Sequence, residues 1–444
     1  MLCLSLINNN TSITEGYMSL DTTPVPQLSD QPLSGQQRRC HMVLMLFMPA
    51  HKVQLEAISQ FNGVGLATTR QDITEVANEI QRFYHLQLNA DSDNSCLIQG
   101  SHLDKRLCLI HWLRRGLRYC PHFVENQFAP HLYQALSWDN TVLSQHLPQI
   151  VSQCEPHLSR QLNEKDRQFL QLYLAYCAWE NQQQVLPELS LTQQQWLECK
   201  PALAAADSLF DSFNPLLGHS LNRVERDMLI LMLTMIKAHS YHSTQSAEDT
   251  RLINAIDQLI THFQQLSGMT LSSNEALISQ LFAHLAPAIE RCYFNIGIDN
   301  SLLEDVIRKY PLLLQTTRQA LVTFEQEYQI QFSADEVGLI AISFGAWLMQ
   351  ENALQEKQIL LLTRNNPELE EQVEQQVREL TLLPLHIKYL PHDVYLQSGA
   401  PTGTTLVLTP YAVRQPESTP PLIQVQLPLT EQQNKQLRSV LELP

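Results

Sequence analysis

The sequence predicts a mainly α-helical protein that ends in a small α/β domain. From about residue 34 to residue 355, apolar residues recur at the spacing of amphipathic helices that pack against one another. Beyond residue 356 the pattern changes to short apolar runs separated by an acidic helical stretch. A chain of 444 residues is long enough for two to four domains, each with its own core.

The composition is that of a globular protein from a reducing compartment. The formal net charge of −16 argues against non-specific coating of nucleic acid by the whole molecule. The nine cysteines are scattered without Cys-x-x-Cys spacing, so we expect free thiols. No apolar run is long enough to span a bilayer, and the first residues lack the basic start of a signal peptide. These features predict a cytoplasmic protein with no membrane partner.

Residues 1–33 are polar and predict a disordered tail, and residues 34–100 predict a winged helix-turn-helix. Apolar stripes indicate three helices, at residues 36–47, 55–61 and 66–83. The glycines of Asn62-Gly63-Val64-Gly65 supply the turn before the third helix. Residues 86–88 and 96–98 then alternate around a polar turn, as the strands of a small wing do. Such a motif inserts the start of its last helix into the major groove of DNA.

The start of the third helix carries the side chains that we expect to contact DNA. Between residues 34 and 118, ten Lys and Arg against seven Asp and Glu give a net charge of +3, so the rest of the chain carries −19. A basic domain on an acidic body is the charge distribution expected of a DNA-binding protein. The predicted DNA-binding residues are Thr68, Thr69, Arg70 and Gln71, with Arg38 and Arg39 as candidate phosphate contacts. The alternative is a three-helix domain that contacts only proteins.

Residues 101–133 are interpreted as a helical connector. Lys105, Arg106, Arg114 and Arg115 lie on a helix that also carries apolar residues. These cations either contact phosphates or form a solvated basic face, and the solvated face is the simpler interpretation.

Two all-helical domains are predicted to follow. Their bounds are residues 134–265 and 266–355. Overlaying Tyr173 on His284 also brings Glu225 onto Glu336 without a gap, so two distant features fall into one register. This agreement indicates a degenerate duplication.

One histidine of the second domain has a setting that invites a functional role. Ser333 and Glu336 have the spacing of a capping box at a helix start, and a similar Ser-x-x-Glu begins at Ser272. His284 lies at the edge of the apolar face behind that earlier cap. A lone histidine in such a place is more often a packed core residue than a reactive one. Arg291 and Glu336 form either a charge clamp near His284 or an ordinary interhelical ion pair.

Residues 356–444 predict a small α/β domain with a parallel sheet. Strands are expected at residues 357–363, 385–390, 404–409 and 422–427, and an acidic helix at residues 367–380. If this domain were catalytic, its nucleophile would stand at the end of the first strand. Residues 363–366 offer neither a Cys nor a glycine-rich phosphate loop there, although the helix start could still hold an anion.

Motifs for catalysis or cofactor binding are absent from the sequence. It contains no GxxxxGK[ST], GxGxxG, HExxH or GxSxG, and no ligand spacing typical of a metal site. We therefore expect a protein that is not an enzyme and that takes no cofactor and no metal.

The second helical domain resembles the phosphotransferase-system regulation domain, or PRD. The matching motifs are His284-Leu285, Ala288-Ile289, Arg291, Asn300, Leu302-Leu303, Tyr310-Pro311, Asp335-Glu336, Gly338 and Ile340-Ala341. The layout as a whole resembles bacterial PRD regulators, which consist of a winged helix, two tandem PRDs and a domain similar to the IIB component of sugar phosphotransferase systems. Further strings, such as RLCLIHWLRRG at residues 106–116, extend the resemblance over nearly all of residues 34–444.

The resemblance also implies how such a protein is regulated. In PRD regulators, paired histidines accept phosphate from the sugar-transport phosphorelay, and the added charge changes how the PRDs pair. When the family's positions are carried over to this sequence, the second domain keeps one of its two histidines, His284, and has Ser343 at the position of the other. The other family positions hold Tyr173, Met232 and, in the IIB-like domain, Thr363 or Arg364. We therefore interpret the phosphorelay of this chain as eroded.

These observations predict a PRD-type transcriptional regulator that binds DNA through residues 34–100. We expect a homodimer formed through the PRDs, with phosphotransferase-system proteins as possible further partners. The alternative is an interaction protein whose helix-turn-helix no longer binds DNA, because only Arg70 is charged at the start of the presumed recognition helix.

Overall fold

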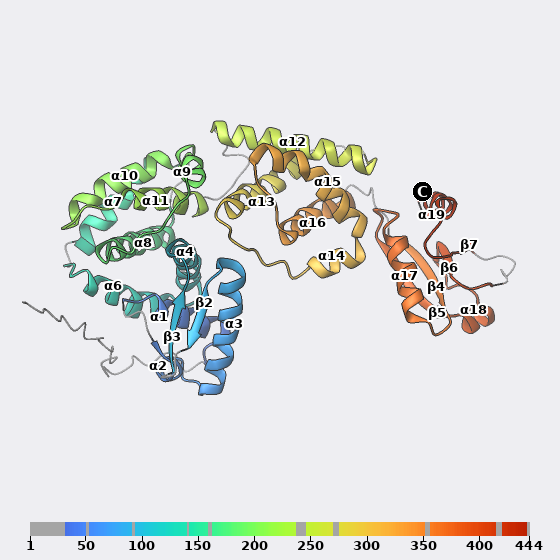
Figure 1. The fold of residues 1–444 in the computed structure, drawn as a ribbon, viewed down its shortest axis with the longest axis horizontal. Coiled ribbons are helices and arrows are strands. Elements are labelled where there is room, and N and C mark those ends of the chain that lie inside the picture. The colour runs from blue at the N-terminus through green and yellow to red at the C-terminus, as the bar shows by residue number, and fades with distance from the viewer. Residues whose placement is uncertain are drawn as a thin grey trace, which may run out of the picture. The chain divides into compact units, whose positions relative to one another are not determined.

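The structure is a computed structural model. It describes residues 32–49, 53–90, 94–139, 142–158, 162–236, 246–269, 275–350, 356–413 and 420–441. The chain divides into two compact units, one ending at Ile236 and the other beginning at Lys237. Helices make up most of both units, and a small parallel sheet lies near the C-terminus, which confirms the predicted fold class in outline (Figure 1). The predicted tail lies outside the described residues, except for its last two positions.

The first unit begins with three helices and a three-stranded antiparallel sheet. Its elements are α1 (Gly35–Leu46), β1 (Val53–Gln54), α2 (Leu55–Asn62), α3 (Leu66–Tyr84), β2 (Gln87–Ala90) and β3 (Ser95–Gln99). β3 pairs with both other strands, and the ladder of β2 and β3 lies beside α3 (Figure 1). The three predicted helices and both predicted strands are present. β1 was not predicted, because two residues are too few to show an alternating pattern.

The rest of the first unit is helical. The α-helices are α4 (His102–Tyr119), α5 (Pro121–Phe123), α6 (Ala129–Ala135), α7 (Leu147–Cys154), α8 (Glu164–Gln182), α9 (Leu191–Glu198), α10 (Leu203–Phe213) and α11 (Arg223–Ile236). Single turns of π- or 3₁₀-helix occur at residues 124–128, 142–146, 155–157 and 214–216.

α4 follows the sheet directly and packs against α1, α3 and α8. Ser101 caps its start by accepting a hydrogen bond from the Asp104 amide at 3.0 Å. Gly116 allows the close approach of α1, because a Cβ atom there would lie 2.6 Å from Cδ1 of Leu44. α4 therefore joins the N-terminal helices to the helices that follow.

In the described part of the second unit, five helices precede the sheet. They are α12 (Ala247–Ser267), α13 (Glu275–Tyr293), α14 (Leu303–Lys309), α15 (Pro311–Tyr328) and α16 (Ala334–Gln350). α12 packs against α13 and α15, and its Phe263 stacks on Phe344 with ring centroids 4.0 Å apart. α12 thus lies in the second unit, although most of it falls before the boundary that we expected at residue 265.

The two sets of helices follow one register. A constant shift of 111 residues, from Glu225 to Glu336, brings both ends of α8 onto those of α13 and the start of α11 onto that of α16. The packing also corresponds, because α10 contacts α7 and α11 while α15 contacts α12 and α16. These agreements support the duplication inferred from the sequence.

The C-terminal part of the second unit is a four-stranded, wholly parallel sheet in the order β5-β4-β6-β7. Its elements are β4 (Lys357–Thr363), α17 (Pro367–Arg378), β5 (Leu385–Pro391), α18 (His392–Ser398), β6 (Leu406–Thr409), β7 (Leu422–Gln424) and α19 (Glu431–Leu441). α17 and α19 contribute side chains to one apolar cluster and α18 to another. The predicted small α/β domain with a parallel sheet is confirmed, whereas α18 and α19 were not predicted.

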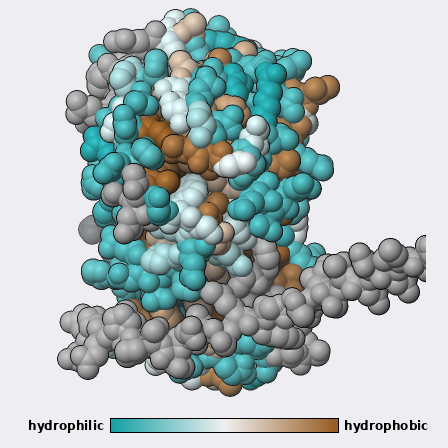
Figure 2. Space-filling view, turned by 90° about the vertical axis from the view of Figure 1, so that its left-hand side faces the viewer, coloured by the Kyte–Doolittle hydropathy of each residue, from teal (hydrophilic) through white to brown (hydrophobic). Residues whose placement is uncertain are grey.

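The surface shown in Figure 2 is largely hydrophilic, with one apolar patch in its upper half. In the described part of the chain, none of the helices is both long and apolar enough to cross a bilayer.

Candidate functional site

The start of α3 presents a small polar surface. α3 begins at Leu66, after Gly63 has ended α2 with a left-handed backbone (φ 62°). Arg70 and Gln71 are exposed, and Thr68 is half-buried. Within the described residues the Arg70 guanidinium has no carboxylate partner, so its charge is free to meet a ligand.

Thr69 does not belong to this surface, which corrects our expectation that it is exposed. Only 1% of the residue is accessible, and its hydroxyl lies 3.4 Å from the carbonyl oxygen of Gly65, one turn earlier. Position 69 shares its face of α3 with the buried residues Asp72, Val76 and Ile80, which explains its burial.

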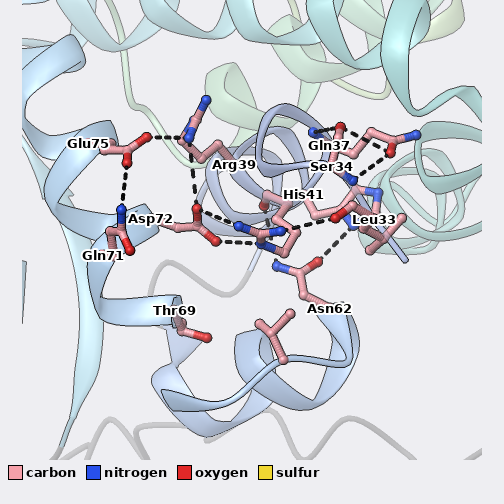
Figure 3. Close-up of polar contacts among 12 residues, drawn as sticks. Leu33, Ser34, Gln37, Arg39, His41, Asn62, Thr69, Gln71, Asp72 and Glu75 are labelled. Atoms are coloured by element: carbon pink, nitrogen blue, oxygen red, sulfur yellow. Dashed lines mark hydrogen bonds and ion pairs between the residues drawn. The ribbon is translucent and has the colours of Figure 1, made fainter. Parts of the chain in front are cut away.

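The two candidate phosphate contacts are held by carboxylates of α3 (Figure 3). Arg38 donates to both carboxylate oxygens of Asp72, at 2.7 and 3.2 Å. Arg39 forms an ion pair with Glu75 and lies 3.9 Å from Asp72. These contacts fix α3 against α1. They also neutralise two cations that the sequence charge count treats as available to DNA.

A second group of charged residues surrounds His284 on α13. Nε2 of His284 lies 3.1 Å from Oε2 of Glu336 on α16, at ion-pair distance but without the alignment of a hydrogen bond. Arg291, two turns further along α13, donates to the other carboxylate oxygen at 2.5 Å. The side chain of Glu336 is 4% exposed, and that of His284 is 20% exposed. The imidazole therefore lies at the border of solvent with its carboxylate partner behind it.

The ionised form of Glu336 is favoured despite its burial. Burial alone raises the pKa of this carboxyl, but His284 and Arg291 lower it more, so that the pKa lies below its ordinary value of 4.5. A carboxylate fixed in this way can orient the neighbouring imidazole. The sequence left two alternatives for Arg291 and Glu336, a charge clamp near His284 or an interhelical ion pair. The structure shows both at once, because Glu336 pairs with Arg291 across two helices and also lies beside His284.

Two details near His284 differ from the sequence expectations. Ser333 caps α16 through the Glu336 amide at 3.2 Å, but the Glu336 side chain contacts Arg291 and does not complete a capping box. The earlier cap at Ser272 lies outside the described residues. Ser343 is 8% exposed and donates its hydroxyl to the Leu339 carbonyl of its own helix at 3.2 Å.

The corresponding place in the first unit is sealed and holds Arg106. Arg106 comes from α4, is 0% exposed, and donates to both oxygens of Glu225 on α11 at 2.8 and 3.0 Å. It also forms an ion pair with Glu180 of α8 and lies 2.9 Å from the Cys177 sulfur. Its guanidinium is 6.0 Å from the ring of Tyr173. Arg106 is therefore neither a phosphate contact nor part of a solvated face, and both interpretations offered for it from the sequence are wrong.

Tyr173, at the place that matches His284, is fully buried. Its hydroxyl has no hydrogen-bond partner among the described residues, and burial raises the pKa of this phenol well above its usual value. Met232, at the place that matches Ser343, is also 0% exposed. Neither side chain is placed to accept a phosphoryl group from solvent.

Arg106 and Glu180 are the site residues that the sequence reasoning missed. The register that places Glu225 on Glu336 also places Glu180 on Arg291, so two glutamates meet where the second unit has one glutamate and one arginine. Two buried carboxylates require a cation to balance their charge. The register of the two repeats could therefore have shown, from the sequence alone, that a cation is needed at this place. It did not identify which cation, because Arg106 lies outside the repeat.

The loop after β4 contains a carboxylate of its own. Oε1 of Glu370, a 4% exposed residue of α17, accepts hydrogen bonds from the Arg364 amide at 2.7 Å and from the Tyr411 hydroxyl at 3.0 Å. The Arg364 side chain lies 2.9 Å from Nε2 of His392. Thr363 is half-buried at the strand end. The amide that an external anion would use is thus already engaged. Elsewhere among the described residues, no cluster of His, Cys, Asp and Glu has the arrangement of a metal site.

Comparisons with known proteins agree with these features. A family model described as "PRD domain" matches residues 257–347, and one described as "Stationary phase-inducible protein CsiE, C-terminal domain" matches residues 357–441. The chain is 39% identical over 418 residues to "Stationary phase-inducible protein CsiE" of Escherichia coli (strain K12), covering 92% of this chain and 97% of that protein.

A more distant similarity extends to a regulator from another bacterium. The chain is 18% identical over 323 residues to "Transcriptional regulator ManR" of Bacillus subtilis (strain 168), which is 72% of this chain and 48% of that protein. The resemblance to PRD-containing regulators that the motifs predict is therefore confirmed.

Proposed function

The chain belongs to the family of the stationary phase-inducible protein CsiE, a family of PRD-type regulators, and from this premise we propose that it is a cytoplasmic transcriptional regulator without enzymatic activity. We infer that residues 34–100 form a winged helix that binds DNA. The observation that carries this proposal is the element order helix, strand, helix, helix, strand, strand, with Arg70 and Gln71 exposed at the start of α3.

Retention on DNA at varied salt tests the proposal. A protein that neutralises phosphates loses affinity steeply as salt rises, because bound counterions are released. We expect Arg70→Ala to weaken binding by about tenfold and to lower the salt slope by about one unit. Arg82→Ala, in the last turn of the same helix, is the matched control and should change both quantities little. Absence of retention even at low salt would exclude DNA binding by this domain.

The alternative, an interaction protein that no longer binds DNA, is favoured by the ion pairs within residues 34–118. Arg38 and Arg39 are paired with Asp72 and Glu75, and Arg115 with Glu79 at 2.5 Å. These pairs leave the net charge of the domain unchanged, but they engage three of its ten Lys and Arg side chains, so fewer cations can contact phosphates. A failed DNA experiment together with retained folding would support this alternative.

We propose that regulation by the phosphotransferase system is weak and limited to the second unit. Its support is the contrast between His284, which reaches the surface, and the buried Tyr173 and Met232. Incubation with the phosphorelay proteins and mass mapping should show little phosphate at His284 and none at Tyr173. Stoichiometric phosphohistidine at 284 with a change in DNA binding would overturn the interpretation of an eroded relay.

We further propose a homodimer formed through the PRD of the second unit. Four large apolar side chains of this PRD are more than 40% exposed. They are Leu302, Ile307, Val322 and Met349. Sedimentation should show a dimer that Ile307→Glu weakens, whereas Arg308→Glu, an adjacent exposed position on the same helix, should leave the dimer intact.

A further inference from the structure

α4 takes part in two packing arrangements inside the first unit. Near its C-terminal end it packs on α1 at Gly116 and pairs with α3 through Arg115 and Glu79. Near its N-terminal end it sends Arg106 between α8 and α11. A rigid helix therefore connects the three N-terminal helices to the first helical repeat, which we define as α7–α11.

The first repeat depends on α4 for its charge balance. Glu180 and Glu225 are 5% and 0% exposed, and Arg106 is their shared cation. Burial opposes the charge on Arg106, but Cys177 and the two glutamates raise its pKa well above the ordinary value, so it stays protonated. In the second repeat, α12–α16, the cation is Arg291 from within the repeat. Only the first repeat thus takes its cation from a helix outside itself.

We propose that Arg106 couples the N-terminal helices to the first repeat, so that α1, α3, α4, α8 and α11 open as one cooperative body. Separating α4 from α8 and α11 would leave two buried carboxylates facing each other without a cation, which is strongly unfavourable. The contact between Phe47 and Tyr176, with ring centroids 6.5 Å apart at 74°, joins α1 to the same region. This inference goes beyond the proposed function, because it holds whether or not the domain binds DNA.

Moving the buried cation from α4 to α8 distinguishes two effects of Arg106: the coupling of the N-terminal helices to the first repeat, and the stability of that repeat itself. In the double variant Arg106→Met with Glu180→Arg, the new guanidinium stands at the place of Arg291 and pairs with Glu225 inside the repeat. Native-state hydrogen exchange of the full chain, without DNA, then reports each helix. We expect α8 and α11 to exchange within about threefold of the wild type, and α1 and α4 to exchange at least about tenfold faster than α8 and α11. In the wild type, the most protected amides of all four helices should exchange at similar rates.

Two further variants make the test decisive. Arg291→Met removes the internal cation of the second repeat; it should raise exchange in α13 and α16 and leave α1, α4 and α8 unchanged. If the double variant does not fold, Arg106→Lys keeps the charge but loses the two-point contact with Glu225, and a smaller gap between α4 and α8 is expected. Equal exchange of α4 and α8 in the folded double variant, or in Arg106→Lys, would show that apolar packing alone couples the two parts and would overturn the proposal.

Discussion

Glu225 and Glu336 occupy corresponding positions in the two repeats, and each joins two helices through a buried ion pair. Glu225 binds Arg106 with two hydrogen bonds, and Glu336 binds Arg291 and approaches His284. Removing one partner of a buried pair leaves the other charge uncompensated, which costs far more than losing an exposed pair. Stability measurements can therefore distinguish these glutamates from the many surface carboxylates of the chain.

We expect Glu225→Ala to lower the free energy of unfolding of the first unit by about 3–5 kcal/mol, because a buried pair is broken. Arg223→Ala is the control on the same helix: its ion pair with Glu198 has side chains that are 76% and 54% exposed. That change should cost no more than about 0.5 kcal/mol. Urea denaturation monitored by circular dichroism measures both effects. Similar costs for the two variants would contradict the buried position of Glu225.

The lowered pKa of Glu336 predicts a dependence on pH. A carboxyl whose pKa is lower in the folded state stabilises the fold above its unfolded pKa, and this contribution is lost as the pH falls through the folded value. We expect Glu336→Gln to be less stable than the wild type at pH 7, and the difference to shrink as the pH falls below about 4.5. Urea midpoints of the second unit between pH 3 and pH 7 test this. A difference that stays constant over that range would argue against the ionised pair.

At the residue scale, the sequence predicts on which face of a helix a side chain lies better than it predicts which other side chains that residue contacts. Helical spacing places His284 at the edge of an apolar face, and its side chain is indeed partly exposed there. The same reasoning places Arg106 on a basic face, but it is fully buried. Local spacing cannot show that two glutamates more than 70 positions away in the chain require this cation. Thr69 fails for a different reason: helical spacing places it on the same face of α3 as the buried Val76 and Ile80, and the position of the recognition helix start was given more weight than that spacing.

The crossing of α1 and α4 offers a prediction at the scale of the element. A Cβ atom at position 116 would lie 2.6 Å from Cδ1 of Leu44 and 3.0 Å from Cγ2 of Val124, both buried methyl groups, so Gly116→Ala should force these side chains to repack. We expect a cost of about 1–3 kcal/mol, even though Ala favours a helix more than Gly does. Gly218→Ala, where nothing lies within 4 Å, should be close to neutral. Thermal unfolding of the two variants measures the difference.

Elements with a clear period or a turn signal could be predicted, but β1, α18 and the 11-residue helix α19 could not. The glycine turn before α3 and the alternating strands gave the N-terminal order, and β4 was predicted with both of its ends correct. β1 has two residues and α18 has seven, too few for a period to emerge. The predicted end of the first repeat, residue 265, lies too late in the chain, because α12 packs in the second unit. The sequence shows that α12 has an apolar face, but it does not show against which helices that face packs.

At the scale of the whole molecule, the two units should unfold separately. Each has its own buried core on its side of residue 236. Calorimetry of the full chain should therefore show more than one transition. Glu225→Ala should lower one transition and Arg291→Met another. If both variants shifted the same transition by the same amount, the two units would have to be a single cooperative structure.

The origin of the buried cation also determines whether the two repeats can replace each other. If α12–α16 took the place of α7–α11, Arg106 would meet a repeat that already contains Arg291, and two guanidinium groups would compete for one carboxylate. The reverse exchange would bury Glu180 and Glu225 with no cation at all. Each repeat is thus specific to its own place in the chain, and a chimera made by swapping them would need Arg106 and position 180 changed together.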